Sequence, residues 1–297
     1  MPGVSLWLYN TTFGWIISGP VPTEQIYNEA RFTSCFITTS AWLNESMPRQ
    51  SKAEDEVRCE NHFKMTHQRQ NDGRFIVSLP FRDDTDQLGR SMELALNRFL
   101  SLKRKFQRFP EFHNEYCAFI NDYLALGHMS PIIDPVLNTG EYYYLPHHAV
   151  FKSSSTTTKL RVVFDASMKT STNLSLNDVL LRGPVIQPDL FDIVLRFRLH
   201  VVVITADVAK MYRQVLVKES DREYQRILWR DSPDKPMGHF RLNTVTYGTV
   251  PASFLATRVL KELAIANVSQ DPKASNSIMK DFYMDDYISG ANDVKEA

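Results

Sequence analysis

The chain has 297 residues, 43% of them hydrophobic, which suffices for a substantial core in one large domain or two ordinary ones. Lys plus Arg and Asp plus Glu both number 34, so the formal net charge is zero and any nucleic-acid site must be a local basic patch. The three cysteines are too few and too scattered for a disulfide framework or a zinc site, and we expect reduced thiols.

The first twenty residues mix aromatic and aliphatic side chains with glycines, which predicts one or two strands joined by turns. This segment has no basic leader, so it does not resemble a signal peptide. No run reaches the roughly 18 apolar residues that a membrane span needs. We therefore expect an intracellular, cytoplasmic protein without a membrane partner.

A polar helix or linker is expected over residues 51–72, followed by a strand-like run over 73–81 and two amphipathic helices. In the first of these helices Ser91 can cap the N-terminus and Pro110 marks the end. Its apolar stripe is Met92, Ala95, Leu96, Phe99, Leu102 and Phe106. The second repeats Phe112, Tyr116, Phe119, Ile120 and Tyr123 at helical spacing. Gly127 suits the C′ position of that helix.

Residues 141–166 predict a hairpin, because the β-prone runs "YYYLPHHAVFK" and "KLRVVFDAS" are separated by the polar segment 153–158. Its arms carry Lys152, Lys159 and Arg161, which together form a local cationic surface. Taken alone, these residues favour an ordinary surface hairpin over a binding surface.

The run "HVVVITADVAKMY" contains a continuous apolar stretch over 201–204, which predicts a strand buried on both faces with Asp207 at its end. An ionised carboxylate there is costly unless something compensates it, and a metal ion is one common compensation. A capping aspartate at a strand end is the alternative.

The stretch "FYMDDYIS" predicts a hairpin with Asp285 and Asp286 at its tip. An Asp-rich turn is the alternative, but adjacent like charges repel, and a divalent cation would turn that repulsion into attraction. Hard oxygen ligands suit Mg²⁺ or Mn²⁺. With Asp207, these residues could hold two metal ions for phosphoryl displacement, which leaves both nucleotidyl transfer and phosphodiester hydrolysis open.

Neighbouring residues favour transfer. Tyr212 can lie against a sugar bound at the metals and sense its 2′-hydroxyl. Lys152 and Arg161 can supply cations to a triphosphate.

A helix is predicted over 253–266, with Thr249 or Ser253 as its cap and Pro251 in its first turn. Gly248, just before it, permits close backbone approach, and the helix N-terminus favours an anion or a template backbone.

In this order and spacing, "TADVAKMY", "YGTVPASFLA" and "YMDDY" resemble the palm motifs of reverse transcriptases, and "KLRVVFDAS" resembles their fingers motif. The chain is most similar to the polyproteins of BEL/Pao-type LTR retrotransposons, through "LNDVLLRGPVIQPDLFDIVLRFR", "QRILWR", "YLALGH" and the region around "LGRSMELALNRFLSLKRKF". The opening "TTFGWIISG" resembles the end of the aspartic protease domain of those polyproteins.

The resemblance implies an α+β fold, the fingers and palm of a right-hand polymerase without a thumb. It implies a protease remnant over 1–22, a partly helical connector over 23–130, and fingers and palm over 131–297. The implied activity is RNA-directed DNA polymerisation on an RNA or DNA template with a primer and dNTPs. Retrotransposon particles and the nucleus are further implied locations, and other polyprotein segments are implied partners.

The family's metal-binding aspartates match Asp207, Asp285 and Asp286, which would hold two Mg²⁺ or Mn²⁺ ions. Its sugar-sensing aromatic residue matches Tyr212 and its template motif glycine matches Gly248; its triphosphate-binding residues match Lys152 and Arg161. The family usually has Pro where Ser253 stands.

After Gly290 only "ANDVKEA" follows, so we expect this chain by itself to polymerise weakly or not at all. The alternative function is a non-catalytic remnant or host-adopted module that binds nucleic acid or protein. A metal-dependent nuclease is a third possibility.

Overall fold

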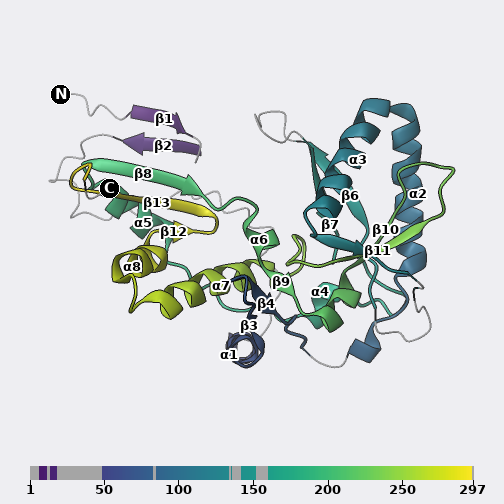
Figure 1. Ribbon diagram of the computed structural model, residues 1–297, viewed down its shortest axis with the longest axis horizontal. Helices are drawn as coiled ribbons and strands as arrows, with labels where there is room; N and C mark the ends of the chain where they lie inside the picture. The colour runs from purple at the N-terminus through teal and green to yellow at the C-terminus, as the bar shows by residue number, and fades with distance from the viewer. Residues whose placement is uncertain are drawn as a thin grey trace, which may run out of the picture. The chain divides into compact units, whose positions relative to one another are not determined.

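The computed structural model describes residues 7–11, 14–18, 49–82, 85–133, 135, 142–151 and 160–295 (Figure 1). The chain divides into two compact units, Met1–Met47 and Pro48–Ala297. The described part of the first unit is an antiparallel hairpin of β1 (Trp7–Thr11) and β2 (Gly14–Ser18), which confirms the strands expected there. The sequence-based boundaries after residues 22 and 130 stay predictions.

The second unit mixes helices with short strands, which confirms an α+β architecture. Its helices are α1 (Arg49–Thr66), η3 (Thr85–Gln87), α2 (Met92–Arg108), α3 (Pro110–Ala125), α4 (Leu176–Val179), α5 (Leu190–Phe197), α6 (Met211–Gln214), η4 (Glu219–Gln225), α7 (Ala252–Asn267) and α8 (Pro272–Lys280). Its strands are β3 (Gln68–Arg69), β4 (Phe75–Val77), β5 (Met129–Pro131), β6 (His147–Phe151), β7 (Leu160–Phe164), β8 (Val202–Asp207), β9 (Leu216–Val217), β10 (Arg226–Trp229), β11 (Gly238–Leu242), β12 (Phe282–Tyr283) and β13 (Asp286–Ala291).

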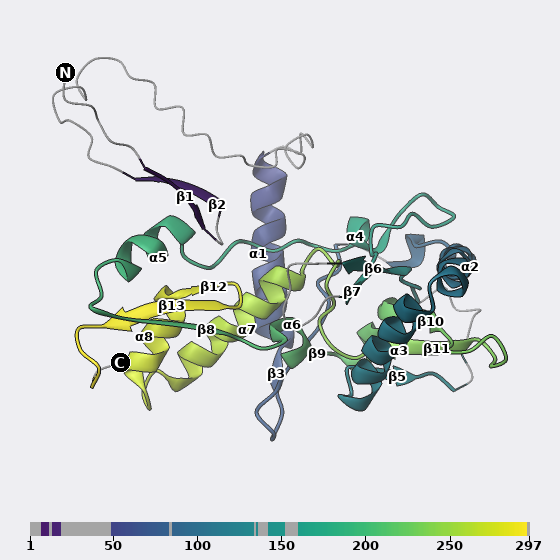
Figure 2. The ribbon, with the colours of Figure 1, turned by 90° about the horizontal axis from the view of Figure 1, so that it is seen from above.

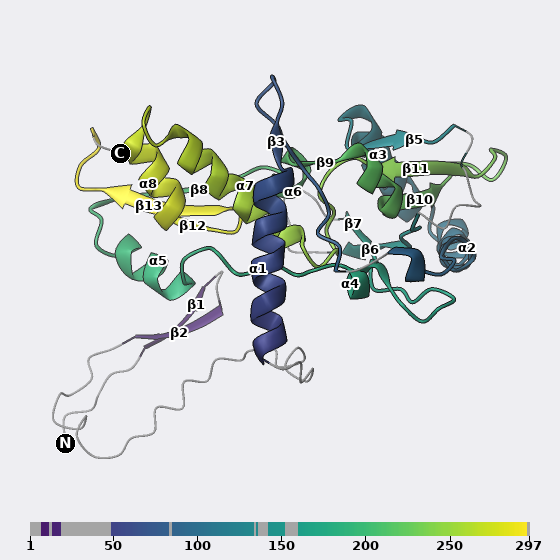
Figure 3. The same cartoon turned by 90° about the horizontal axis from the view of Figure 1, so that it is seen from below.

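The strands form separate small sheets, ordered β12-β13-β8, β10-β11-β5, β3-β4-β9 and β6-β7. Figures 2 and 3 show the β12-β13-β8 sheet on one side of α1, and the β10-β11-β5 and β6-β7 sheets on the other. In the same views α5 lies on one side of the β12-β13-β8 sheet and α8 on the other. This small sheet carries the aspartates that the sequence singled out.

Helices α2 and α3 form where the apolar stripes predict them. Ala95, Phe99 and Phe106 are buried on α2, and Phe112, Tyr116, Ile120 and Tyr123 are buried on α3. Pro110 is the first residue of α3, where the missing N–H removes no helical hydrogen bond. Gly127 takes the expected C′ position with φ +69°, and its N–H donates to the Leu124 carbonyl at 3.0 Å.

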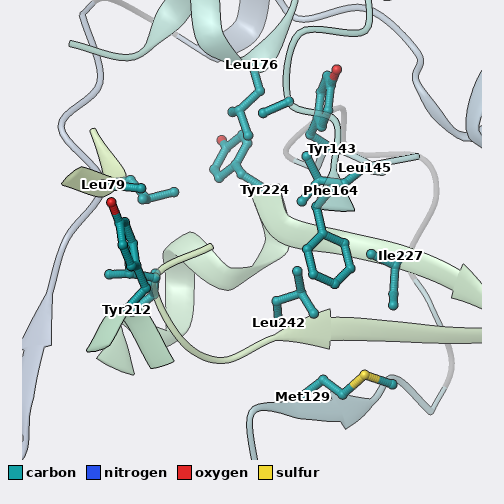
Figure 4. Packing of buried hydrophobic residues seen from close by; sticks show 14 of the residues in the cluster. Leu79, Met129, Tyr143, Leu145, Phe164, Leu176, Tyr212, Tyr224, Ile227 and Leu242 are labelled. Carbon is teal, nitrogen blue, oxygen red and sulfur yellow. The ribbon is translucent and has the colours of Figure 1, made fainter. Parts of the chain in front are cut away.

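The main core joins the sheets to the helices. It includes Phe164 from β7, Ile227 from β10 and Leu242 from β11, which Figure 4 shows in one layer of packed side chains. On β7 burial alternates, so Leu160, Val162 and Phe164 face the core while Arg161 is exposed.

Of the polar helix or linker expected over 51–72, helix α1 covers the part up to Thr66, and β3 follows at Gln68–Arg69. The helix is not fully solvated, because Cys59 and Phe63 are buried. It is tied to α7 by Arg258, whose guanidinium is 3.1 Å from both Glu60 carboxylate oxygens and 2.8 Å from Glu262. The Arg258 side chain is only 5% exposed, whereas Glu60 and Glu262 are 24% and 21% exposed, so the arginine is the buried member of this ion-pair network. The strand predicted over 73–81 is shorter, spanning Phe75–Val77.

The expectation that the apolar run before Asp207 is buried on both faces was wrong. Val201 and Val203 are 79% and 53% exposed. Strand β8 is an edge strand that pairs only with β13 among the described strands, and α5 packs on β13 and β12. A continuous apolar run was therefore not sufficient evidence of a central strand.

The side-chain cap bonds expected at two helices do not form, although Ser91 takes the expected N-cap position of α2. Ser91 precedes α2, but its hydroxyl accepts the Tyr144 N–H at 2.8 Å and makes no cap bond. The residue before α7 is Pro251, without a side-chain cap. Thr249 instead donates to the Thr246 carbonyl, and the hydroxyl of Ser253 pairs with Tyr212.

Within the described residues, no helix combines the length and apolar character needed to cross a membrane. Cys59 and Cys117 are free thiols, as expected, whereas Cys35 lies outside the described residues.

Candidate active site

Strand pairing brings two of the predicted aspartates face to face. In the antiparallel β8–β13 pair Asp207 lies opposite Asp286. The next facing pair, Val208 and Asp285, is hydrogen-bonded, because the Val208 N–H donates to the Asp285 carbonyl at 2.8 Å. Asp207 and Asp286 therefore form a non-hydrogen-bonded pair, the kind in which facing Cα atoms are only about 4.5 Å apart.

The third aspartate, Asp285, lies in the turn between β12 and β13, as the sequence predicted. Tyr283 pairs with Asp286, so Met284 and Asp285 are the central turn residues. Met284 has φ +56°, whereas Asp285 is not among the positive-φ residues, which is the pattern of a type II′ turn. This turn normally takes Gly first, so a methionine there stores backbone strain. The Met284 N–H donates to the Gln187 side-chain oxygen at 3.0 Å.

The three carboxylates influence one another. Asp207 and Asp286 are exposed and Asp285 is half-buried. Partial burial, then the charge of Asp285 and then that of Asp207, raise the pKa of Asp286 above its ordinary value. The ionised form of Asp286 is thus disfavoured in the folded chain, as expected for a partly buried carboxylate beside two like charges.

Tyr212 lies beside this hairpin, on the short helix α6 that follows β8. Its hydroxyl is 3.0 Å from the Ser253 hydroxyl, and its ring centroid is 4.2 Å from that of Tyr247. Burial raises the pKa of Tyr212. The hydrogen bond to Ser253 lowers this pKa, and the charge of Asp285 raises it further. Tyr212 is only 7% exposed, whereas Tyr247 is 40% exposed and covers the same corner of the site.

Gly248 adjoins Tyr247 and makes the close backbone approach that the sequence predicted. Its φ is +101°, and a Cβ there would lie 2.0 Å from the Phe164 carbonyl oxygen of β7. Asn177 secures the loop, because its amide donates to the Gly248 carbonyl at 2.9 Å and its oxygen accepts the Val250 N–H at 2.8 Å. Only glycine satisfies both the dihedral and the contact.

Arg161 extends the site on the β7 side. Burial raises the pKa of Tyr247, the charges of Tyr212 and Asp285 raise it further, and those of Arg213 and Arg161 oppose this. Arg161 and Asp285 therefore both lie within electrostatic reach of one phenol. Lys152, the second predicted triphosphate ligand, lies outside the described residues.

The donor types fit a hard divalent cation, since carboxylates are the ligands that Mg²⁺ prefers in proteins. In the described ranges, however, no three His, Cys, Asp or Glu side chains are grouped closely enough to hold a metal ion. The three aspartates converge at one corner of the sheet without forming a ready-made coordination shell.

Several residues of this corner were missed by the sequence reasoning. Lys210 and Arg213 flank Tyr212 in "AKMYRQ", and two cations so close to Asp207 were a signal that could have been used. Tyr247, Asn177 and Gln187 act through contacts distant in sequence, for which the sequence carries no local signal.

Comparison with models of known protein families finds no match, and comparison with curated proteins finds no significant match.

Proposed function

We propose that this chain is the reverse-transcriptase region of a BEL/Pao-type LTR retrotransposon polyprotein, an RNA-directed DNA polymerase. The observation that carries the proposal is the convergence of Asp207, Asp285 and Asp286 at the ends of β8 and β13, beside Tyr212. In this proposal β8, β12, β13 and α7 belong to the palm, and β6 and β7 belong to the fingers.

The chain's own residues would bind and orient the substrates, a primed RNA or DNA template and a dNTP. Arg161, whose charge acts on the Tyr247 phenol, would neutralise phosphate charge near that ring. Tyr212, with its hydroxyl fixed by Ser253, would press against the sugar and exclude a 2′-hydroxyl. Two Mg²⁺ or Mn²⁺ ions, held by the three aspartates, would supply the charge neutralisation that activates the primer 3′-hydroxyl and stabilises the leaving pyrophosphate.

Because this chain by itself is expected to polymerise weakly at most, the test measures residual primer extension by a large excess of purified chain on a primed homopolymer template with labelled dTTP and Mg²⁺ or Mn²⁺. Asp285→Asn should abolish extension, because it removes one carboxylate charge at the turn. Asp234→Asn is the matched control, because Asp234 is an exposed aspartate in a surface turn. Extension that survives Asp285→Asn would refute the assigned role of these aspartates.

A second candidate is a non-catalytic module that binds nucleic acid or protein. It is favoured by the absence, in the described part of the chain, of a closely grouped set of three metal-binding side chains, and by the burial of Tyr212. Template binding without extension, equal in wild type and Asp285→Asn, would support this module. Cleavage of end-labelled single strands under the same conditions would instead indicate a nuclease.

A further inference from the structure

The outer edge of the β12-β13-β8 sheet is open in the described part of the chain. Val208 and Asp285 form a hydrogen-bonded pair, and along an antiparallel ladder every second residue of β8 before Val208 also bonds to β13. The residues between them, Val203 and Thr205, point their N–H and C=O groups away from β13. No described strand or loop pairs with these groups. Strand β8 therefore presents unpaired backbone donors and acceptors to a further strand.

Strand β8 also lacks the features that keep edge strands apart. Natural proteins protect such edges with lysine, other charges, proline or a bulge. The segment 202–206, "VVITA", contains no charge and no proline, and its pairing with β13 runs without a bulge. Four of its five residues are β-branched, which favours strand pairing. An unprotected edge of this kind is suited to pairing with another strand.

The open edge adjoins an uncovered side of the sheet. Tyr287 of β13 bonds to Ser277 of α8 at 2.8 Å, so Tyr287 and the facing Ala206 lie on the α8 side. Side chains alternate along a strand, and Val203 and Thr205 therefore lie on the other side, which carries α5 (Figures 2 and 3). Helix α5 packs on β13 and β12, and it leaves Val203 exposed.

Exposed apolar side chains gather along α5, the turn after it and β8. They form what we call the edge patch: Phe191, Leu195, Leu199, Val201 and Val203. Phe191 and Leu195 are one helical turn apart, so they lie on one face of α5. Large exposed apolar patches mark interaction sites, and this patch adjoins unpaired backbone groups. The two features together favour a partner that supplies both a strand and an apolar surface.

Charge determines which partner fits. Arg198 lies in the turn before β8, where it is exposed and has no side-chain partner among the described residues. At the other end of the strand Asp207 faces Asp286, beside Asp285. Antiparallel pairing of β8 with a second copy of itself places Arg198 of each copy beside the acidic end of the other. Parallel pairing would place like charges together, which is destabilising.

We propose that β8 is a dimerisation strand that pairs antiparallel with β8 of a second copy of this chain. A two-fold axis at Ile204 lets Val203 of each copy exchange hydrogen bonds with Thr205 of the other, which uses the free groups of both strands. The two three-stranded sheets become one continuous sheet, with both edge patches on the same side of it. This inference goes beyond the proposed function and does not depend on it.

The test measures the mass of the full chain by sedimentation velocity at concentrations of about 1–100 µM, over which the wild type should shift from monomer to dimer. Val203→Lys should weaken association about ten-fold or more, because it places a charge on the edge of each copy. Val268→Lys is the matched control. Val268 is 53% exposed, as Val203 is, but it follows α7, so this variant should associate like the wild type.

Charge reversal tests the direction of the strands. Arg198→Glu should weaken association several-fold, because it places a glutamate beside the acidic end of the second copy. Arg104→Glu, at an exposed arginine of α2, should have no effect and controls for net charge. Equal association of Arg198→Glu and the wild type would reject the antiparallel arrangement.

Hydrogen exchange tests the strand pairing itself. The Thr205 amide should exchange slowly in the dimer and fast in the diluted monomer, because only the dimer gives it an acceptor. The Ile204 amide points at β13 and should exchange slowly in both states. Fast exchange of the Thr205 amide in the dimer would reject pairing through β8.

Circular dichroism checks that each variant is folded, and Thr205→Lys replaces Val203→Lys if the latter does not fold. A wild type that stays monomeric throughout would overturn the proposal and leave the open edge to a strand of a different polypeptide. Dimers that persist unchanged in Val203→Lys would overturn it by placing the interface elsewhere. Association into ever larger species would show that no two-fold axis closes the contact, and would also reject the proposed dimer.

Discussion

Replacing Gly248 with Ala should destabilise the fold by an amount that the structure allows to be worked out. At φ +101° a Cβ is strained, which costs about 1 kcal/mol or more. The same Cβ would lie 2.0 Å from the Phe164 carbonyl oxygen, a backbone atom that cannot rotate away. Forcing an extra carbon into a packed site costs about 1–3 kcal/mol, so the expected loss in free energy of unfolding is about 2–4 kcal/mol.

Gly127→Ala is the matched control for the dihedral alone. Gly127 also has a positive φ, +69°, but nothing lies within 4 Å of the position of its Cβ. This variant should therefore lose only about 1 kcal/mol. The difference between the two variants combines the contact between the loop before α7 and the end of β7 with the greater strain of φ +101° compared with φ +69°.

Urea denaturation followed by circular dichroism measures both losses, and unchanged denaturant slopes would show that both variants unfold like the wild type. If Gly248→Ala is no more destabilising than Gly127→Ala, the close approach of residue 248 to the Phe164 carbonyl oxygen does not contribute to stability. This contact would then not hold the Tyr247 loop against β7.

Three further predictions concern charge. Burial lowers the pKa of His147 from 6.5 to about 4, so between these pH values the unfolded chain binds more protons than the folded chain. Acidification from pH 6.5 to 4 should therefore lower the free energy of unfolding, measured by urea titration, by about 3 kcal/mol. The free energy of unfolding of His147→Gln should depend less steeply on pH. Arg258→Ala leaves two glutamates without their buried partner and should cost about 3–5 kcal/mol. Lys64→Ala removes an exposed lysine from the same Glu60 and should cost under about 1 kcal/mol in the same titrations. Partial burial and the charges of Asp285 and Asp207 raise the pKa of Asp286, so Asp286→Asn should stabilise the protein in metal-free buffer. Solvent screening of this exposed group keeps the gain under about 1 kcal/mol, and a loss of stability would contradict the repulsion from Asp285 and Asp207.

Elements with a strong local period could be predicted from the sequence. The stripes of α2 and α3 recur at helical spacing, and the buried positions found on both helices all belong to them. The hairpin carrying Asp285 and Asp286 was also predictable, because strand-forming residues flank a two-residue turn. In these cases neighbours in sequence decide the structure.

Features that depend on tertiary partners could not be predicted. The hydroxyls of Ser91 and Ser253 have the chemistry of helix caps, but each finds a partner distant in sequence, the Tyr144 N–H and the Tyr212 hydroxyl. Local side-chain chemistry shows which bonds a residue can make and leaves open which of them the fold provides. The same holds for Val203, whose exposure depends on what packs over β8.

The β12–β13 hairpin combines several features that each oppose stability. Met284 holds a positive φ without being glycine, Asp286 faces a like charge on Asp207, and Val203 of the paired strand is exposed. An aspartate-rich turn with only a structural role would need none of these, since glycine at the first turn position and an uncharged residue opposite Asp286 would be more stable. Strain and repulsion concentrated at one corner are typical of sites selected for binding rather than for stability. A cation would convert this repulsion into attraction, which is why we favour a metal-dependent role for these aspartates over a simple turn.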